Sequence, residues 1–251
     1  MDDPALLRYS RHLLLNEIGV EGQERIGRTK VLVVGAGGIG SPASMYLVAA
    51  GIGRLVLLDD DSVDLTNLQR QIAHTTQRIG QNKARSAAAS LQALNPTVPI
   101  DARPVRGVEP FLSEVLAQVD IALDCSDNRA TRYALNRACL AARKPLVLAA
   151  ASGFDGQLAV FDFRDVDTPC YACLFPEAAG GEDDNCATMG VFAPLTGIMG
   201  SMQAAETLRL ICRFGPPPNG ELLALDARSM ELRRLRFARD PQCAVCSMRP
   251  K

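Results

Sequence analysis

Two C-x-x-C sequences give this chain its most specific chemical pattern. Cys170 and Cys173 form the first pair, and Cys243 and Cys246 form the second. Four thiolates are a ligand set for a tetrahedral structural zinc site. Neither pair has a neighbouring His or Glu that would indicate an open catalytic metal. We therefore expect one structural Zn²⁺ that ties the end of the chain to its middle; unpaired or redox-active thiols are the alternative.

A glycine-rich turn lies between an apolar run and a helical segment in the first part of the chain. Residues 35–40 read GAGGIG, a G-x-G-x-x-G sequence whose backbone can approach a phosphate at a helix N-terminus. Asp59 follows the next apolar run, where a carboxylate can bind ribose hydroxyls. The pattern predicts nucleotide binding and by itself favours NAD over ATP, with a ligand-free glycine turn as the alternative. The candidate contacts are Gly35, Gly37, Gly38 and Gly40.

Polar and cationic residues follow Asp59, and a dinucleotide site does not need two cations there. Asn67 and Arg70 lie in the segment NLQRQ, and Lys83 begins the next helical stretch. Two cations suit a triphosphate, because departing pyrophosphate accumulates charge that arginine can hold in a bidentate fork. The expectation therefore moves from NAD to ATP, although Arg70 or Lys83 taken singly is also typical of a solvated surface.

The segment DCSDN, residues 124–128, follows another apolar run. Ligand sites in doubly wound sheets lie at the carboxyl ends of strands, so Asp127 is placed to hold Mg²⁺ on ATP phosphates. A helix N-cap is the alternative, because Asp and Asn commonly occupy that position. The sequence leaves both interpretations open for Asp127, and Asn128 beside it is a further candidate cofactor contact.

Cys186 stands alone in residues 176–189, a Gly- and acid-rich stretch without helical or strand periodicity. Loops of this length in compact domains are often functional. An accessible thiol near an activated acyl group can become acylated, so Cys186 is either incidental or the nucleophile of a covalent step.

The remaining cysteines and the two histidines lie outside these motifs. Cys125, Cys139 and Cys212 fall in apolar or helical settings and are expected to be packing residues. His12 and His74 have no partner motif, and we assign neither a catalytic role.

Alternating strands and helices must position these motifs. Continuous apolar strands that alternate with helices predict a mostly parallel sheet covered on both faces. The expected buried strands are residues 31–34, 55–58, 119–123 and 146–150, and the expected helices are 41–50, 83–94 and 131–142. Residues 156–163 alternate as a half-exposed strand, and 221–225 can pair near 232–237. We therefore predict an α/β fold: a Rossmann-like, doubly wound, mostly parallel sheet continued by antiparallel strands, with a structural zinc site.

We expect residues 1–251 to form one domain, in which three parts differ in role. Residues 1–28 read as a helical arm with one apolar face, residues 29–155 as a nucleotide-binding half, and residues 156–251 as the half that holds zinc. A further helix over residues 198–211 is expected in the core, although its small residues would also allow close packing against a second subunit.

The composition of the chain limits which partners and which cellular compartment are expected. The formal net charge is −1, from 27 basic and 28 acidic residues scattered along the chain, which argues against nucleic acid or a membrane surface as the main partner. Acidic residues stand near the N-terminus where a signal peptide would be positive, and the apolar runs are too short to span a bilayer. We therefore expect a cytoplasmic protein, in which cysteines are thiols or metal ligands.

Read in order, the motifs closely resemble the ThiF/MoeB/HesA family, the bacterial relatives of ubiquitin-activating enzymes. The resemblance covers essentially the whole chain. It rests on RYSRH, GAGGIG, DDDSVDLTNLQRQ, DCSDN, GQLAVF, PCYAC, NCATMGVFAPLTGIMGSMQAAE and CAVC. It implies an adenylyltransferase that uses ATP and Mg²⁺ to activate the C-terminal glycine of a ubiquitin-like sulfur-carrier protein, ThiS- or MoaD-like, before thiocarboxylate formation in thiamine or molybdopterin biosynthesis.

The resemblance also implies roles for individual residues. Gly38 corresponds to the ATP phosphate loop and Asp59 to the ribose ligand, whereas Asn67, Arg70 and Lys83 correspond to phosphate contacts. Asp127 corresponds to the Mg²⁺ ligand. Arg11 corresponds to an arginine that enters the neighbouring subunit of a homodimer, and Cys186 to a cysteine that bonds covalently to the carrier in some members. The zinc ligands correspond to Cys170, Cys173, Cys243 and Cys246, and carrier binding is assigned to residues 156–251.

The implied partners are a carrier ending in Gly-Gly and a second copy of the chain. Because the chain ends soon after Cys246, we expect a separate sulfur donor of the cysteine desulfurase or rhodanese type. Local matches leave the thiamine and molybdopterin branches both open.

Three other functions make different demands on the sequence. A non-catalytic binding subunit should lack Arg70, Lys83 and Asp127, which are present. A branch that modifies tRNA should carry a basic surface. An NAD-dependent dehydrogenase would bind NADH in a titration.

Overall fold

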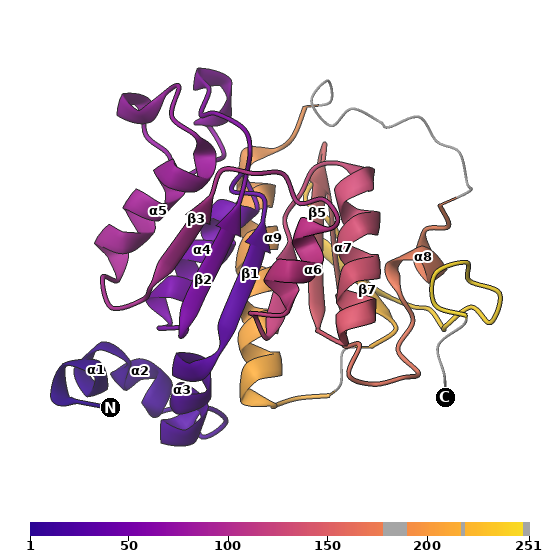
Figure 1. Cartoon of the computed structure of the whole chain (residues 1–251), viewed down its shortest axis with the longest axis horizontal. Coiled ribbons are helices and arrows are strands. Elements are labelled where there is room, and N and C mark those ends of the chain that lie inside the picture. Colours follow the sequence, from indigo (N-terminus) through magenta and orange to yellow (C-terminus); the bar gives the residue numbers. More distant parts are fainter. Residues whose placement is uncertain (178–189, 217–218, 248–251) are drawn as a thin grey trace.

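The computed structural model describes residues 1–177, 190–216 and 219–247 (Figure 1). One eight-stranded sheet runs through it in the order β3-β2-β1-β4-β5-β6-β7-β8. The first five strands in this order are parallel, and β6, β7 and β8 continue the sheet as antiparallel strands. The strands are β1 (Lys30–Val34), β2 (Arg54–Leu58), β3 (Ile100–Arg103), β4 (Ile121–Asp124), β5 (Leu146–Ser152), β6 (Asp155–Phe161), β7 (Glu221–Asp226) and β8 (Glu231–Arg236). The predicted fold class is confirmed.

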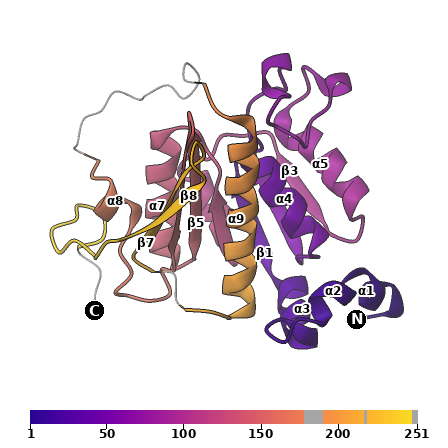
Figure 2. The ribbon, with the colours of Figure 1, turned by 180° about the vertical axis from the view of Figure 1, so that it is seen from behind.

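Helices cover both faces of this sheet, as the continuous apolar strands require. One core lies between the sheet and α3, α4, α5 and α9, and a second lies between the other face and α6, α7 and α8. Figure 1 views the sheet from the side of α6 and α7, and Figure 2 from the side of α9. The helices are α1 (Asp3–Arg8), α2 (Ser10–Leu13), α3 (Gly19–Arg28), α4 (Gly40–Ala49), α5 (Lys83–Leu94), α6 (Phe111–Leu116), α7 (Arg129–Ala142), α8 (Tyr171–Leu174) and α9 (Ala193–Cys212), with short 3-10 turns η1 (Leu65–Asn67) and η2 (Thr76–Arg78).

The N-terminal arm differs from the continuous apolar face that its leucines predicted. Tyr9 interrupts the helix between α1 and α2, and neither helix has a buried residue. Leu7 and Leu14 are 78% and 73% exposed. The arm lies at the amino ends of the parallel strands (Figure 1).

The expectation of a half-exposed strand at residues 156–163 is wrong. All but the first residues of β6 are buried, because α9 lies over one face and Phe161 and Phe163 pack in the core on the other. The predicted pairing of the last two strands is confirmed as β7 with β8. Several short elements were not anticipated, namely β3, α6, α8 and the two 3-10 turns.

Helix α9 is a core helix of this chain. A Cβ at Gly200 would lie 2.3 Å from the carbonyl oxygen of Ile39, so the glycine permits close contact with the start of α4. The expected packing role of this helix is therefore fulfilled within the subunit. Among the described residues, no helix is long and apolar enough to cross a membrane.

Candidate nucleotide site and metal centre

A pocket of about 610 Å³ opens at the carboxyl ends of the parallel strands. It lies where β1 has β2 on one side and β4 on the other, so that the chain changes direction across the sheet. Open α/β sheets bind ligands at such switch points. The volume is within the range of small-molecule sites, roughly 300–1,000 Å³.

Most of the predicted nucleotide residues line this pocket. They come from the ends of β1, β2 and β4, from the η1 segment and from the start of α5. The lining residues that the sequence predicted are Gly35, Gly37, Gly38, Asp59, Asn67, Arg70, Lys83, Asp127 and Asn128. Gly40 instead lies beneath the loop as the first residue of α4.

Two glycines of the loop are required by its geometry. Gly35 has a φ of 99°, and a Cβ there would lie 2.7 Å from the carbonyl oxygen of Cys125. A Cβ at Gly40 would lie 1.8 Å from the carbonyl oxygen of Gly35. The loop can therefore make its turn between β1 and α4 only without these side chains.

The carboxylate of Asp59 is oriented by backbone amides. Its Oδ2 accepts a hydrogen bond from the Ala36 N–H at 2.7 Å, and its Oδ1 accepts one from the Asp61 N–H at 2.9 Å. Burial raises the pKa of Asp59, while these amides and the nearby Lys83 oppose the shift. Each oxygen retains a lone pair that can accept a ribose hydroxyl.

Lys83 is not a solvated surface charge. Its side chain is only 10% exposed, and its Nζ lies 2.9 Å from Oδ2 of Asp61, which is 65% exposed. The Asn82 side chain caps α5 and donates to the carbonyls of Asp59 and Asp61, which ties the strand end to the helix. An exposed partner is weakly held, so a phosphate can displace Asp61 from the ammonium group.

Arg70 enters the pocket from the segment after η1. Its Nη1 donates to the carbonyl oxygen of Thr66 at 3.2 Å. No carboxylate pairs with Arg70 within the part of the chain that the structure describes. Arg70 and Lys83 therefore provide two cations in the lining of the pocket.

Asp127 does not cap the helix that follows it. The N-cap of α7 is Asn128, whose Oδ1 accepts from the Thr131 N–H at 2.9 Å. Asp127 is exposed and lines the pocket. The capping alternative for Asp127 is therefore wrong, because the side chain of Asn128 caps the helix.

A buried carboxylate supports the segment that carries Asp127. Oδ1 of Asp124 accepts from both the N–H and the hydroxyl of Ser126, at 2.9 and 2.6 Å. Arg132 donates to the carbonyl oxygen of Ser126 at 3.0 Å. Burial raises the pKa of Asp124, and Arg132 opposes that shift. These contacts hold the turn after β4 in place at the edge of the pocket.

Several lining residues were missed from the sequence. Some of them lie at or after strand ends, and others lie in the first turns of helices. A search of the residues at every predicted strand end would have found the first group. They include Arg106, Ser126, Thr131, Arg132, Ser152 and Thr196.

His74 supports the glycine loop, although it belongs to no motif in the sequence. Its Nε2 lies 2.9 Å from the carbonyl oxygen of Ala36, and its Nδ1 lies 3.0 Å from the hydroxyl of Ser86. A carbonyl can only accept, so Nε2 carries the proton and Nδ1 accepts from Ser86. Burial lowers the pKa of His74, which favours this neutral form. The imidazole thus links the loop to α5, the helix that begins with Lys83.

We expect His74→Ala to weaken ATP binding about tenfold, because a buried hydrogen bond is worth roughly 1–3 kcal/mol when its partner is left unpaired. ATP titration of the folded variant measures this. Ser86→Ala is the matched control: it leaves the bond to Ala36 in place and should have a smaller effect. Unchanged ATP affinity in His74→Ala would contradict the positioning role.

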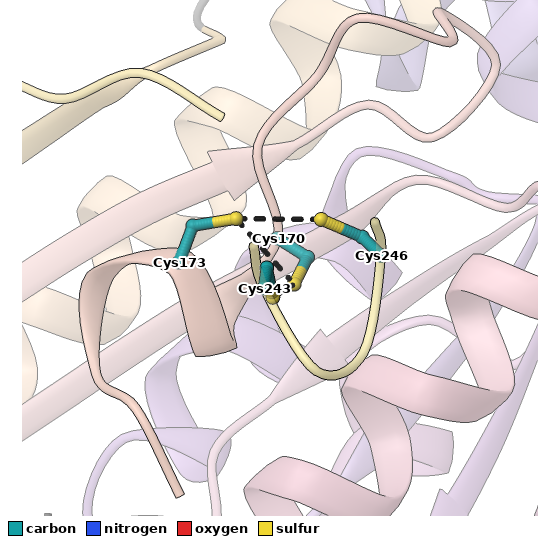
Figure 3. Close-up of side chains that lie close together, drawn as sticks. All are labelled: Cys170, Cys173, Cys243 and Cys246. Atoms are coloured by element: carbon teal, nitrogen blue, oxygen red, sulfur yellow. Dashed lines mark hydrogen bonds between the residues drawn. The ribbon is translucent and has the colours of Figure 1, made fainter. Parts of the chain in front are cut away.

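The two cysteine pairs meet in one cluster (Figure 3). All four sulfur atoms lie within 4.8 Å of one another. Sγ of Cys170 is 3.7 Å from that of Cys243, and Sγ of Cys173 is 3.4 Å from that of Cys246. A tetrahedral site with Zn–S bonds of about 2.3 Å requires sulfur separations of about 3.8 Å, whereas a disulfide requires about 2.0 Å. The cluster can therefore hold a metal ion.

Its surroundings also suit a metal. The backbone N–H of Asp240 donates to Sγ of Cys173 at 3.4 Å. Burial, followed by the neighbouring thiols, raises the pKa of Cys246 to about 11. At Cys243 burial is outweighed by hydrogen bonds, which lower the pKa of that thiol. Cys246 therefore retains its proton near neutral pH without a metal, and metal binding must displace that proton. The other cysteines of the described residues, Cys125, Cys139 and Cys212, are buried and lie outside this cluster, as predicted.

Arg11, a further predicted site residue, does not line the pocket. Arg11 is an exposed residue of α2, at the end of the sheet opposite the pocket (Figure 1). Cys186 lies outside the described residues.

Comparison with known proteins accords with this geometry. The sequence profile of the ThiF family matches residues 9–245. This chain belongs to the ThiF family. A Thermus thermophilus relative named sulfur carrier protein adenylyltransferase is 44% identical over 247 residues, with 97% of this chain and 91% of that protein covered.

Two Escherichia coli members of the ThiF family are similarly related. The sulfur carrier protein ThiS adenylyltransferase is 42% identical, covering 98% of this chain and 97% of that protein. The molybdopterin-synthase adenylyltransferase is 41% identical, covering 98% of each. These nearly equal identities do not separate the two branches. In fold, the chain resembles the crystal structure of E. coli MccB with MccA-N7isoASN, with a TM-score of 0.81 at 23% identity over 96% of this chain and 74% of that one.

Proposed function

We propose that this chain uses ATP to adenylate the C-terminal glycine of a ubiquitin-like sulfur-carrier protein, which prepares the carrier for thiocarboxylate formation in thiamine or molybdopterin biosynthesis. The observation that carries the proposal is the convergence of the glycine loop, Asp59, Arg70, Lys83 and Asp127 on one pocket. Three relatives at 41–44% identity are named as adenylyltransferases that act on sulfur carriers or serve molybdopterin synthase. A non-catalytic binding subunit would have no need for these charged residues together.

The chemistry follows from the charges in the pocket. The carrier's terminal carboxylate attacks the α-phosphate of ATP, the bond to pyrophosphate breaks, and an acyl-adenylate forms. The nucleophile is already ionised, so no general base is necessary. Catalysis then rests on positioning and on neutralising the phosphate charge, which Arg70 and Lys83 can do. Asp59 would bind the ribose, and Asn67 and the loop amides near Gly38 would contact phosphate.

We propose Asp127 as the residue that holds Mg²⁺ on the ATP phosphates. A carboxylate that faces the pocket and has no capping role fits a hard cation with oxygen ligands. When bound, the ion would supply further positive charge next to the departing pyrophosphate.

For the metal centre we propose a structural Zn²⁺ held by Cys170, Cys173, Cys243 and Cys246. The sulfur separations support tetrahedral coordination, and no position is left open for chemistry. In this division residues 29–155 bind the nucleotide, and residues 156–251 bind the zinc and the carrier within one domain of residues 1–251.

We further propose a homodimer in which Arg11 of one subunit enters the pocket of the other. Arg11 is exposed on α2, which lies at the amino ends of the parallel strands, whereas the pocket opens at their carboxyl ends. The exposed leucines of the same arm offer apolar surface for a partner. Sulfur would come from a separate protein of the cysteine desulfurase or rhodanese type.

ATP–pyrophosphate exchange should require a carrier with a free C-terminal glycine. Labelled pyrophosphate is incorporated into ATP only if the adenylate forms reversibly. Removal of the terminal glycine should therefore reduce exchange to background. Exchange that persists with the truncated carrier would contradict the proposed substrate.

Cys186→Ala should retain exchange within a few-fold of the parent. Adenylation needs the carboxylate, ATP and the cationic groups, so a thiol can act only after the adenylate exists. Any defect should appear in thiocarboxylate formation, measured by mass spectrometry of the carrier. Loss of exchange in the folded variant would contradict this division between the two steps.

A further inference from the structure

A second pocket, of about 340 Å³, lies at the other end of the sheet from the nucleotide site. Its walls come from the end of α3, the starts of β4 and β5, the segment after β6 and the end of α9. All of these lie at the amino ends of the parallel strands, on the side of the N-terminal arm (Figure 1). The length of the sheet therefore separates this basal pocket from the nucleotide site.

The basal pocket is cationic with an apolar floor. Arg25, Arg28, Arg164 and Arg213 line it, against one carboxylate, Asp120. Oδ2 of that carboxylate already accepts a hydrogen bond from the Lys30 N–H at 2.9 Å. The apolar lining residues are Ile121, Pro145, Leu210 and Ile211.

Two of the four guanidinium groups are available to a ligand. Arg28 pairs with Glu24, and Arg164 pairs with Asp162. Arg25 donates from Nη2 to the carbonyl oxygen of Cys212 at 3.1 Å, but its buried Nε has no hydrogen-bond partner within the described residues. Arg213 is exposed, and within the part of the chain that the structure describes no carboxylate pairs with it.

Arg213 occupies a backbone conformation that ordinarily favours glycine. It is the C-cap of α9, with a φ of 62°. Glycine is usual at left-handed positions that end helices, and another residue there incurs strain. Attraction of a cation to the helix C-terminus explains a positive charge near this point. It does not explain why Arg213 lines a pocket together with three other arginines.

Arg143 can be compared directly with Arg213. It is the C-cap of α7 and adopts the same left-handed conformation, with a φ of 51°. It does not line the basal pocket. The two arginines share charge, helix position and backbone strain, and differ in access to the pocket.

We propose that the basal pocket binds a small phosphate-bearing molecule, with Arg25 and Arg213 as the principal contacts. Guanidinium groups bind phosphate through paired hydrogen bonds, and the apolar floor can accept a short non-polar portion of the ligand. The volume of about 340 Å³ is near the lower end of the range for small-molecule sites. The site is separate from the ATP pocket and does not rest on the proposed function.

Inorganic phosphate is the probe for the first experiment. The full chain is titrated with phosphate at constant ionic strength, with the nucleotide pocket saturated by a non-hydrolysable ATP analogue, and binding is followed by ³¹P NMR line broadening and by the shift in Tm. The parent protein should bind phosphate, and Arg143→Gly should bind it equally. Arg213→Gly should raise the Kd at least tenfold, and Arg25→Met should do the same.

The Arg213→Gly and Arg143→Gly variants should both remain folded, so a difference in their phosphate affinity can be attributed to the pocket. Glycine suits both left-handed positions, so neither substitution should unfold the chain. Equal phosphate binding by Arg213→Gly and Arg143→Gly would overturn the proposal. Complete loss of phosphate binding when the ATP analogue is present would also overturn it, because phosphate would then occupy only the nucleotide site.

Discussion

Asp127→Ala should reduce carrier-dependent ATP–pyrophosphate exchange by about 100- to 1,000-fold or more, the scale seen when one electrostatic contact to a transition state is lost. The carboxylate faces the pocket and takes no part in capping α7, so its removal should leave the fold intact. Carrier binding should change little, because docking uses a protein surface elsewhere. Exchange kinetics and a binding titration of the carrier measure the two effects separately.

Two related variants sharpen this prediction. Asp127→Asn preserves the shape of the side chain and removes its charge, so it should lose nearly as much exchange as Asp127→Ala. Asn128→Ala removes the helix cap and should lower the free energy of unfolding by about 1 kcal/mol. Near-normal exchange in Asp127→Ala would remove Asp127 from the site.

Cys243→Ser should abolish zinc binding and strongly lower thermal stability. The four thiols join α8 and its N-cap residue to residues 243–246, and a metal that binds only the folded state contributes its binding free energy to folding. Metal analysis of protein prepared without chelator should find one zinc per chain in the parent and none in the variant. Thermal unfolding should show the matching loss of stability.

A buried cysteine outside the cluster serves as the control. Cys212 lies at the end of α9, and Cys212→Ala should retain zinc even if packing suffers. ATP binding should remain measurable in whatever fraction of Cys243→Ser stays folded, because the nucleotide pocket uses other strands. A parent protein without zinc, or a chelator that leaves its Tm unchanged, would contradict a structural metal.

The amino-acid sequence by itself determined the features that depend on neighbours along the chain. Apolar runs such as residues 31–34 indicated buried strands, and residues 35–40 indicated a tight glycine turn between a strand and a helix, because backbone conformation and periodicity are local properties. The positions of Asp59 and Asp127 after strand ends were enough to place both at one edge of the sheet, since parallel strands end together.

Tertiary structure decided what depends on contacts between distant segments. Strand β3 is short and polar in part, and only its pairing with β2 makes it a strand. Strand β6 is buried because α9 and a second core cover it, which alternation along the strand could not reveal.

The division of roles at the site was decided in the same way. Asp127 and Asn128 are equivalent as capping residues by type, and the chain's path after β4 selected Asn128. His74 acquired its position from Ala36 and Ser86, which are distant in sequence. The basal pocket assembles arginines from α3, the turn after β6 and the end of α9. No pattern along the chain predicts this group of arginines, because the packing of the helices on the sheet brings them together.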